Sequence, residues 1–264
     1  MILVRYKLIL KITYSKRGVP MQITVKQLSK SYKDKTILDN VTFTIESGTV
    51  CGLLGVNGAG KSTLMKILFG LVPKSSGEIQ FDGLPKSKQS LGALIEAPAI
   101  YHNLSAYDNL KTKALLYDIP DSKIIKTLEI IGLSNTRKKK AGKFSLGMKQ
   151  RLGIGMAILT DPQFLILDEP TNGLDPDGIK ELLDLIRSLK AKGMTILVSS
   201  HQLLEISKVA DHILILDKGK IQYDGENKNV DSLERLFFKI VHGGYWYAKD
   251  ILFGIAQITT FRND

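Results

Sequence analysis

The sequence contains a single cysteine and no long apolar run. Cys51 cannot form a disulfide within the chain, and its place in an apolar stretch indicates a small buried side chain in a reducing compartment. No stretch approaches the roughly 18 apolar residues of a membrane helix, so we expect a soluble chain. Internal repeats and low-complexity segments are absent as well. The 264 residues, 44% of them apolar, suffice for one core, with or without a subdomain.

The net charge of +11 is unevenly distributed. Residues 1–20 hold five basic side chains and no acid, so subtracting these five from +11 leaves +6 for the rest. That excess suits an anionic membrane face, a nucleotide or a nucleic acid and does not choose among them. Lysines interrupt the apolar stretches of residues 1–20, which is unlike a signal peptide. We expect the functional protein to begin at Met21, after an N-terminal extension; a short basic arm is the alternative.

Hydrophobic patterning predicts an α/β fold. Two segments, 23–28 and 41–45, alternate apolar and polar residues as half-buried antiparallel strands do. Continuous apolar runs, typical of strands covered on both faces, occupy 50–54, 164–167, 195–198 and 213–216. Helical patterns separate them at 61–69, 178–192 and 202–209. Together they predict a parallel, helix-flanked sheet with an antiparallel lip.

Two further regions complete the organisation. Helical patterns at 106–117, 121–131 and 146–159 replace the strand signal, which predicts a helical subdomain of about 97–160 inserted into a core domain of 21–226. The C-terminal tail, 227–264, is rich in aromatic residues. These rings either pack on the body of the protein or bind a partner.

A glycine-rich motif follows the predicted strand that ends at Leu54. It reads "GVNGAGKST" and fits the phosphate-loop pattern, in which glycines let backbone amides surround an anion at a helix N-terminus. Lys61 can reach the outer phosphates, and Ser62 offers a hydroxyl to Mg²⁺. The motif therefore predicts a nucleoside triphosphate site. Its candidate binding residues are Gly55, Asn57, Gly58, Ala59, Gly60, Lys61, Ser62 and Thr63.

Three polar side chains follow buried strands. Asp168 and Glu169 come after "FLIL", and His201 comes after "TILVSS". Because the carboxyl ends of parallel strands line the ligand-binding crevice of such sheets, we expect these residues near the phosphates. Asp168 suits Mg²⁺, Glu169 suits polarisation of the attacking water, and His201 can hydrogen-bond a γ-phosphate.

The motifs together resemble those of a known family. Tyr32, "GVNGAGKST", "FSLGMKQR", "FLILDEP", "TNGLDP" and "VSSHQ" occur in the order found in nucleotide-binding subunits of ATP-binding cassette (ABC) transporters. The resemblance covers about 21–223. It implies a P-loop NTPase core of the ABC type, an inserted helical subdomain, and a head-to-tail dimer of two copies around two ATP molecules.

The resemblance also assigns roles to residues outside the phosphate loop. Tyr32 would stack on adenine, Ser145 and Gly147 would cap the ATP of the second copy, and Asp175 would belong to the loop that couples the two sites. The signature departs from the family's usual Leu-Ser-Gly-Gly-Gln, because it reads Phe-Ser-Leu-Gly-Met at 144–148. Leu146 still supplies a backbone N–H, so we expect the signature to function.

A second departure indicates a subfamily. After "LGALI" the family normally has a glutamine that touches Mg²⁺, whereas this sequence has Glu96, which can also ligate Mg²⁺. The stretch "LIEAPAIYHNLSAYDNL" resembles the subunits that protect bacteria against lantibiotics and bacitracin-like peptides. A tolerated substitution in another ABC exporter is the alternative.

The sequence therefore predicts an ATP-hydrolysing subunit that powers a separate integral-membrane permease from the cytoplasmic face of the bacterial membrane. Its cofactors would be ATP and Mg²⁺, with Ser62, Glu96 and Asp168 near the metal and Lys61, Glu169 and His201 catalytic. No nucleic acid partner is expected. One alternative is a soluble ABC ATPase that acts on nucleic acid or the ribosome, which the basic charge would allow. Another is an inactive ATP-binding subunit.

Overall fold

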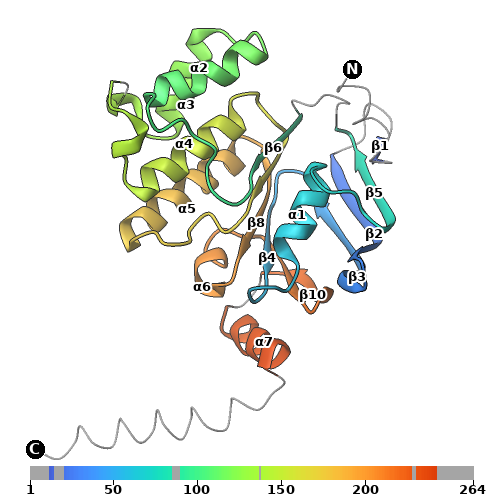
Figure 1. The fold of residues 1–264 in the computed structure, drawn as a ribbon. Coiled ribbons are helices and arrows are strands. Elements are labelled where there is room, and N and C mark those ends of the chain that lie inside the picture. The colour runs from blue at the N-terminus through green and yellow to red at the C-terminus, as the bar shows by residue number, and fades with distance from the viewer. Residues whose placement is uncertain (1–11, 15–20, 85–89, 137, 228–229, 243–264) are drawn as a thin grey trace, which may run out of the picture.

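The computed structural model describes residues 12–14, 21–84, 90–136, 138–227 and 230–242. Two β-sheets and a group of helices make up the described molecule (Figure 1). The larger sheet carries helices, and the smaller, mainly antiparallel sheet lies beside it. The predicted α/β fold with an antiparallel lip is confirmed.

The six-stranded sheet has the order β10-β9-β4-β8-β7-β6. Its strands are β4 (Val50–Leu54), β6 (Leu91–Leu94), β7 (Phe164–Leu167), β8 (Thr195–Ser200), β9 (His212–Asp217) and β10 (Lys220–Glu226). All are parallel to their neighbours except β10, which is antiparallel to β9. Every residue of β4, β7 and β8 is buried, as expected for strands covered on both faces.

The four-stranded sheet has the order β1-β5-β2-β3. Its strands are β1 (Ile12–Tyr14), β2 (Gln22–Tyr32), β3 (Lys35–Glu46) and β5 (Ser76–Asp82). β2 is antiparallel to both β3 and β5, whereas β1 is parallel to β5. The predicted strands 23–28 and 41–45 lie within β2 and β3, and both strands extend further than their apolar alternation indicated.

Helices follow most of the parallel strands, and one more helix follows β10. They are α1 (Lys61–Phe69), α2 (Ala106–Leu116), α3 (Asp121–Ile130), α4 (Leu146–Ile158), α5 (Pro176–Ala191), α6 (Leu203–Ile206) and α7 (Val230–His242), with two 3₁₀ turns at Ser134–Thr136 and Ala141–Lys143. The helices α2, α3 and α4 lie together at one end of the molecule, between β6 and β7 in sequence (Figure 1). The predicted helix 202–209 is wrong in length, because α6 has only four residues.

The core forms two clusters, one on each face of the six-stranded sheet. Alternation along each strand separates them: Leu53, Ile166 and Leu197 join the cluster with α1 and the four-stranded sheet, whereas their neighbours Leu54, Leu167 and Val198 join the cluster with α2 to α5. This alternation decides which side chains at the strand ends face α1.

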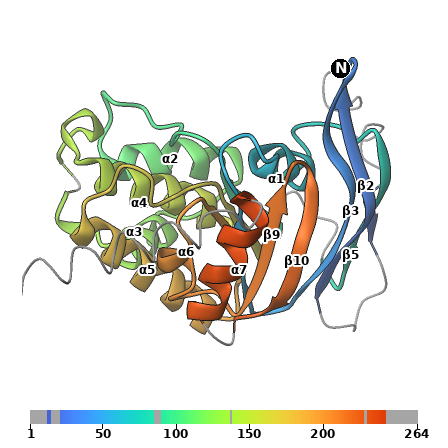
Figure 2. The ribbon, with the colours of Figure 1, turned by 90° about the horizontal axis from the view of Figure 1, so that it is seen from below.

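The helix α7 was not predicted. Seen from below, it lies against α6 and β9 (Figure 2). Leu233 and Phe237 are buried in the core, whereas Phe238 is 42% exposed. The other aromatic residues of the predicted tail, Tyr245, Trp246, Tyr247 and Phe253, lie outside the described residues. Within the described ranges, none of the helices has the length and apolar character needed to cross a bilayer.

Candidate functional site

The phosphate loop connects β4 to α1, as predicted. A Cβ atom at Gly55 would lie 2.4 Å from the carbonyl oxygen of Leu216, so only glycine fits there. Gly60 is the N-cap of α1 and has φ 114°, a conformation that favours glycine. No side chain caps α1, so its first amides remain available to an anion. Within the loop, Ala59 is buried, whereas Asn57 and Gly58 are exposed.

Lys61 is the buried cation of the loop. Its side chain is only 4% exposed, and its Nζ donates to the carbonyl oxygens of Gly55 at 2.7 Å and Val56 at 3.3 Å. The third partner is Glu169, whose Oε1 lies 3.0 Å from Nζ. A buried charge is tolerated when it is paired in this way. Ser62 and Thr63, the next residues of α1, are partly exposed.

The carboxyl ends of β7 and β8 bring the other predicted catalytic residues to the same place. Glu169 follows β7, and its Oε2 lies 2.9 Å from Nδ1 of His201, which follows β8. The backbone of Glu169 has φ 45°, an uncommon conformation for a residue with a side chain. Lys61, Glu169 and His201 therefore form one continuous polar chain across three loops.

The surroundings of Glu169 keep it ionised. Partial burial raises the pKa of its carboxyl group, but the hydrogen bond and charge of Lys61, together with His201, outweigh burial and leave the pKa below its ordinary value. A carboxylate that is charged at neutral pH can accept a hydrogen bond or a proton from water.

Asp168 is the buried neighbour of Glu169. Its side chain is 5% exposed, and its Oδ1 accepts a 2.6 Å hydrogen bond from Ser199 Oγ. The sequence does not single out Ser199, because the predicted strand ends at Val198. The continuation of β8 through Ser200 places Ser199 in the site.

Glu96 lies at the same edge of the sheet. It follows β6, where the Leu94 carbonyl oxygen accepts a 2.8 Å hydrogen bond from the backbone N–H of Asp168. The Glu96 carboxylate forms an ion pair with Lys66 of α1. Glu96 has φ 64°, which is also an uncommon conformation for a residue with a side chain.

Tyr32 ends β2 and is 48% exposed. The Lys30 ammonium lies 4.5 Å from the centroid of the Tyr32 ring, a distance typical of a cation–π interaction.

The signature segment begins α4. Ser145 is the N-cap of that helix, and its Oγ accepts a 3.3 Å hydrogen bond from Met148 N. Asp175 caps α5 in the same way, accepting a 2.8 Å bond from Gly178 N. The two helix starts are neighbours, because a Cβ atom at Gly147 would lie 3.8 Å from Leu174 Cδ2. α4 packs on β6 and α5, whereas α1 packs on β3 and β6.

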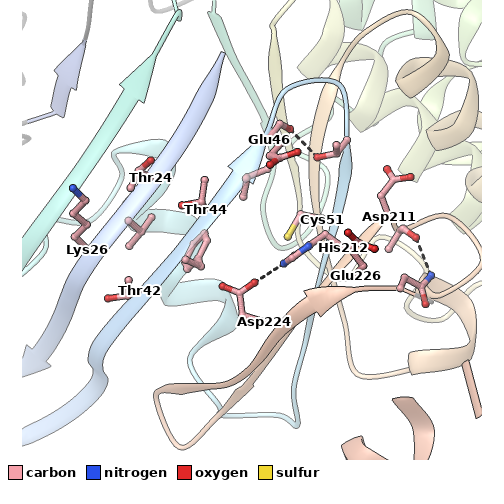
Figure 3. A pocket seen from close by; sticks show the side chains of 16 residues that line it. Thr24, Lys26, Thr42, Thr44, Glu46, Cys51, Asp211, His212, Asp224 and Glu226 are labelled. Carbon is pink, nitrogen blue, oxygen red and sulfur yellow. Dashed lines mark hydrogen bonds and ion pairs between the residues drawn. The ribbon is translucent and has the colours of Figure 1, made fainter. Parts of the chain in front are cut away.

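A cavity of about 790 Å³ lies elsewhere, between the two sheets (Figure 3). Cys51 and His212 line it near the amino ends of β4 and β9, the edge opposite the phosphate loop. His212 Nε2 is also hydrogen-bonded to the Asp224 carboxylate there. Cys51 is a buried free cysteine, as predicted. Burial holds the pKa of its thiol far above the usual range. Ligands of such sheets bind at the carboxyl ends, so this cavity is not the triphosphate site.

Comparison with known proteins identifies the family. The family model described as "ABC transporter" matches residues 38–172. The chain belongs to this family. It is 49% identical over 218 residues to the lantibiotic transport ATP-binding protein SrtF of Streptococcus pyogenes, covering 81% of this chain and 95% of that protein. It is 45% identical over 207 residues to the bacitracin transport ATP-binding protein BcrA of Bacillus licheniformis, covering 75% and 68% respectively.

Solved structures agree with this assignment. An ATP-binding subunit of an ABC transporter matches with a TM-score of 0.69 and 32% identity, covering 81% of this chain and 92% of that chain. The cbiO1 protein of Clostridium perfringens, part of the ABC transporter complex cbiONQ, matches with a TM-score of 0.74 and 28% identity, covering 84% and 95%.

The chain is therefore an ATP-binding and ATP-hydrolysing ABC subunit, homologous to lantibiotic and bacitracin transport ATP-binding proteins. The predicted family and subfamily resemblance are confirmed. These relatives favour the transport interpretation over a soluble ATPase that acts on nucleic acid or the ribosome.

Proposed function

We propose that this ABC subunit powers a separate membrane permease that protects a bacterium against lantibiotic or bacitracin-like peptides, working at the cytoplasmic face of the membrane. The proposal is supported by the names of its relatives and by the chain of contacts from Lys61 through Glu169 to His201. Only the ATP-hydrolysing machinery lies in the described chain, so the permease would determine which peptide is moved.

The phosphate loop and the strand ends divide the work of hydrolysis. The glycine backbone and Lys61 would bind the β- and γ-phosphates, Glu169 would orient the attacking water and accept its proton, and His201 would hold Glu169 and the γ-phosphate in line. General-base assistance of this kind is worth about 10² to 10⁴ in rate. Tyr32 would stack on the adenine through its half-exposed ring.

The donor set at the loop fits Mg²⁺. The Ser62 hydroxyl and the Asp168 carboxylate are hard oxygen donors, and Mg²⁺ is usually held by one or two carboxylates together with substrate phosphates. Bound there, Mg²⁺ would neutralise charge that develops on the transferred phosphoryl group. Glu96 is a further oxygen donor at this edge, with its carboxylate held by Lys66.

The signature would complete the site of a second copy. Ser145 and the first amides of α4 form an anion-binding helix start. Packing within this chain would tolerate a Cβ atom at Gly147, which would meet nothing closer than 3.8 Å, so the lack of a side chain there would serve the phosphates of the second copy. Two copies in head-to-tail contact would bury two ATP molecules, with the Asp175 segment coupling the two sites.

Drug sensitivity tests the proposed transport. The gene would be deleted in its host and restored as wild type, as Glu169→Gln, or as Asp184→Asn, which changes an exposed carboxylate of α5. We expect the deletion and Glu169→Gln strains to become sensitive to a lantibiotic or to bacitracin, and Asp184→Asn to restore resistance. Unchanged sensitivity of the deletion strain to both peptides would refute the proposed substrate class.

A further inference from the structure

Ser199 contacts both acidic residues of the site, Asp168 through its carboxylate and Glu169 through its backbone. The Ser199 side chain is fully buried. Ser199 is the last residue but one of β8, two positions before His201. Leu167 pairs with Val198 across β7 and β8, so Ser199 is the next residue of β8, opposite the start of the loop that carries Asp168 and Glu169.

The hydroxyl of Ser199 makes two hydrogen bonds of opposite sense. It donates to Asp168 Oδ1 at 2.6 Å and accepts from the backbone N–H of Glu169 at 2.8 Å. A serine hydroxyl has one proton and two lone pairs, so it can serve both partners at once. Hydrogen bonds to an ionised carboxylate are stronger than bonds between neutral groups, so the bond to Asp168 is the stronger of the two.

The face of the sheet explains why Ser199 and not Ser200 reaches Asp168. Side chains two residues apart on a strand share a face. Ser199 therefore points to the same face as Leu197, and Asp168 to the same face as Ile166. Leu197 and Ile166 both pack in the cluster with α1. Ser200 belongs to the opposite face, where its Oγ donates to the carbonyl oxygen of Gln202 at 3.3 Å and accepts from the backbone N–H of Gln202 at 2.8 Å.

We propose that Ser199 is a positioning residue for ATP hydrolysis, which locks the Asp168–Glu169 peptide so that both carboxylates face the phosphate loop. Glu169 has φ 45°, and its N–H must be held for that conformation to persist. With Oδ1 engaged by Ser199, Asp168 would offer Oδ2 to Mg²⁺. The inference rests on the proposed roles of Asp168 and Glu169 and deepens them.

The test compares Ser199→Ala with Thr195→Val in the full chain. Thr195 is the matched control, because it is also fully buried on β8 and its Oγ1 accepts a 2.9 Å bond from Gly48 N, at the end of the strand remote from His201. Ser199→Cys replaces the hydroxyl by a thiol, a weak hydrogen-bond donor, while keeping the space filled.

Two measurements are made on each protein: steady-state ATP hydrolysis at saturating Mg²⁺, and binding of a fluorescent, slowly hydrolysed ATP analogue as the Mg²⁺ concentration is varied. We expect Ser199→Ala to lower kcat about 10- to 100-fold and to raise the Mg²⁺ concentration for half-maximal binding by a similar factor. The KM for ATP should change by less than about threefold. Thr195→Val should lower the Tm but leave kcat and the Mg²⁺ dependence unchanged.

If Ser199→Ala does not fold, Ser199→Cys replaces it in the test. We expect Ser199→Cys also to lower kcat and to raise the Mg²⁺ concentration needed for half-maximal binding. The inference is overturned if a folded Ser199 variant keeps the wild-type kcat and Mg²⁺ dependence, or if it loses no more activity than Thr195→Val. Failure of the proposed hydrolysis itself looks different, because the wild-type protein would then not turn over ATP, or Glu169→Gln would turn it over normally.

Discussion

Lys61 Nζ and Glu169 Oε1 lie 3.0 Å apart, so the cation of the phosphate loop and the carboxylate at the end of β7 form a partly buried ion pair. The two residues are far apart in sequence and meet because β4 and β7 both flank β8 in the parallel sheet. A phosphate that binds Lys61 therefore competes with Glu169 for the same ammonium group, which links phosphate binding to the position of the proposed base.

Glu169→Gln tests the role of the carboxylate in hydrolysis. The amide keeps the size of the side chain but cannot act as a base, so we expect kcat to fall about 10² to 10⁴-fold while ATP is still bound. Phosphate release and equilibrium binding of ATP measure the two properties separately. Normal turnover by this variant would remove Glu169 from its role, and lack of turnover by the wild type would favour the inactive-subunit alternative.

The lowered pKa of Glu169 predicts a pH dependence of stability. A carboxyl group with a depressed pKa in the folded state stabilises that state above its unfolded pKa, about 4.3, and this contribution is lost as the pH falls through the folded value. The difference in unfolding free energy between wild type and Glu169→Gln should therefore be largest near neutral pH and shrink below about pH 4.3.

Urea unfolding at several pH values measures that difference. Asp184→Asn is the control, because its exposed ion pair with Arg187 should contribute little at any pH. A difference for Glu169→Gln that grows as the pH is lowered would contradict the assigned direction of the shift.

Ser145 allows the capping role and the proposed dimer role to be separated. Aspartate is as good an N-cap as serine, whereas alanine costs about 1 kcal/mol. Ser145→Asp should therefore fold with wild-type stability but fail to form the ATP dimer, because its carboxylate would face the phosphates of the second copy. Ser145→Ala should lose stability. Light scattering with ATP and thermal unfolding report the two effects, and an ATP dimer of Ser145→Asp would refute the proposed contact.

The Glu96–Lys66 ion pair should matter little for stability. Their side chains are 67% and 30% exposed, and exposed pairs contribute about 0 to 1 kcal/mol. We expect Glu96→Gln, which restores the family's usual residue, to change the unfolding free energy by less than about 1 kcal/mol and to retain ATP hydrolysis. Loss of hydrolysis in a stable Glu96→Gln protein would show that the carboxylate itself is needed.

The buried parts of the fold were predictable from the sequence. The strands Val50–Leu54 and Phe164–Leu167 and the helix Lys61–Phe69 have the predicted bounds, because uninterrupted apolar runs and a glycine-rich start leave few alternatives. The strands β1, β5, β6 and β10 were missed. β10 alternates exposed and partly buried residues, and β6 has only four residues, so neither gives a strong periodic signal.

Site residues that belong to a sequence motif were predictable, whereas site residues that only the folded structure brings together were not. Motif residues such as Lys61 and Glu169 were named from the sequence, and their contact follows from the strand order. Ser199 was missed because its importance depends on the register of β8 against β7, which no local pattern reveals. The partner of Glu96, Lys66, was missed for the same reason, since it lies on α1 and meets Glu96 only in the folded chain.

The account as a whole depends on two copies completing each other's sites. The most direct test is the molar mass and nucleotide content of Glu169→Gln in Mg-ATP, measured by light scattering and by quantifying the bound ATP. We predict a dimer of about 59 kDa, twice the 29.3 kDa chain, with two ATP molecules. The account would be contradicted if Glu169→Gln bound ATP as a monomer at every protein concentration and the wild-type protein turned ATP over at full rate as a monomer.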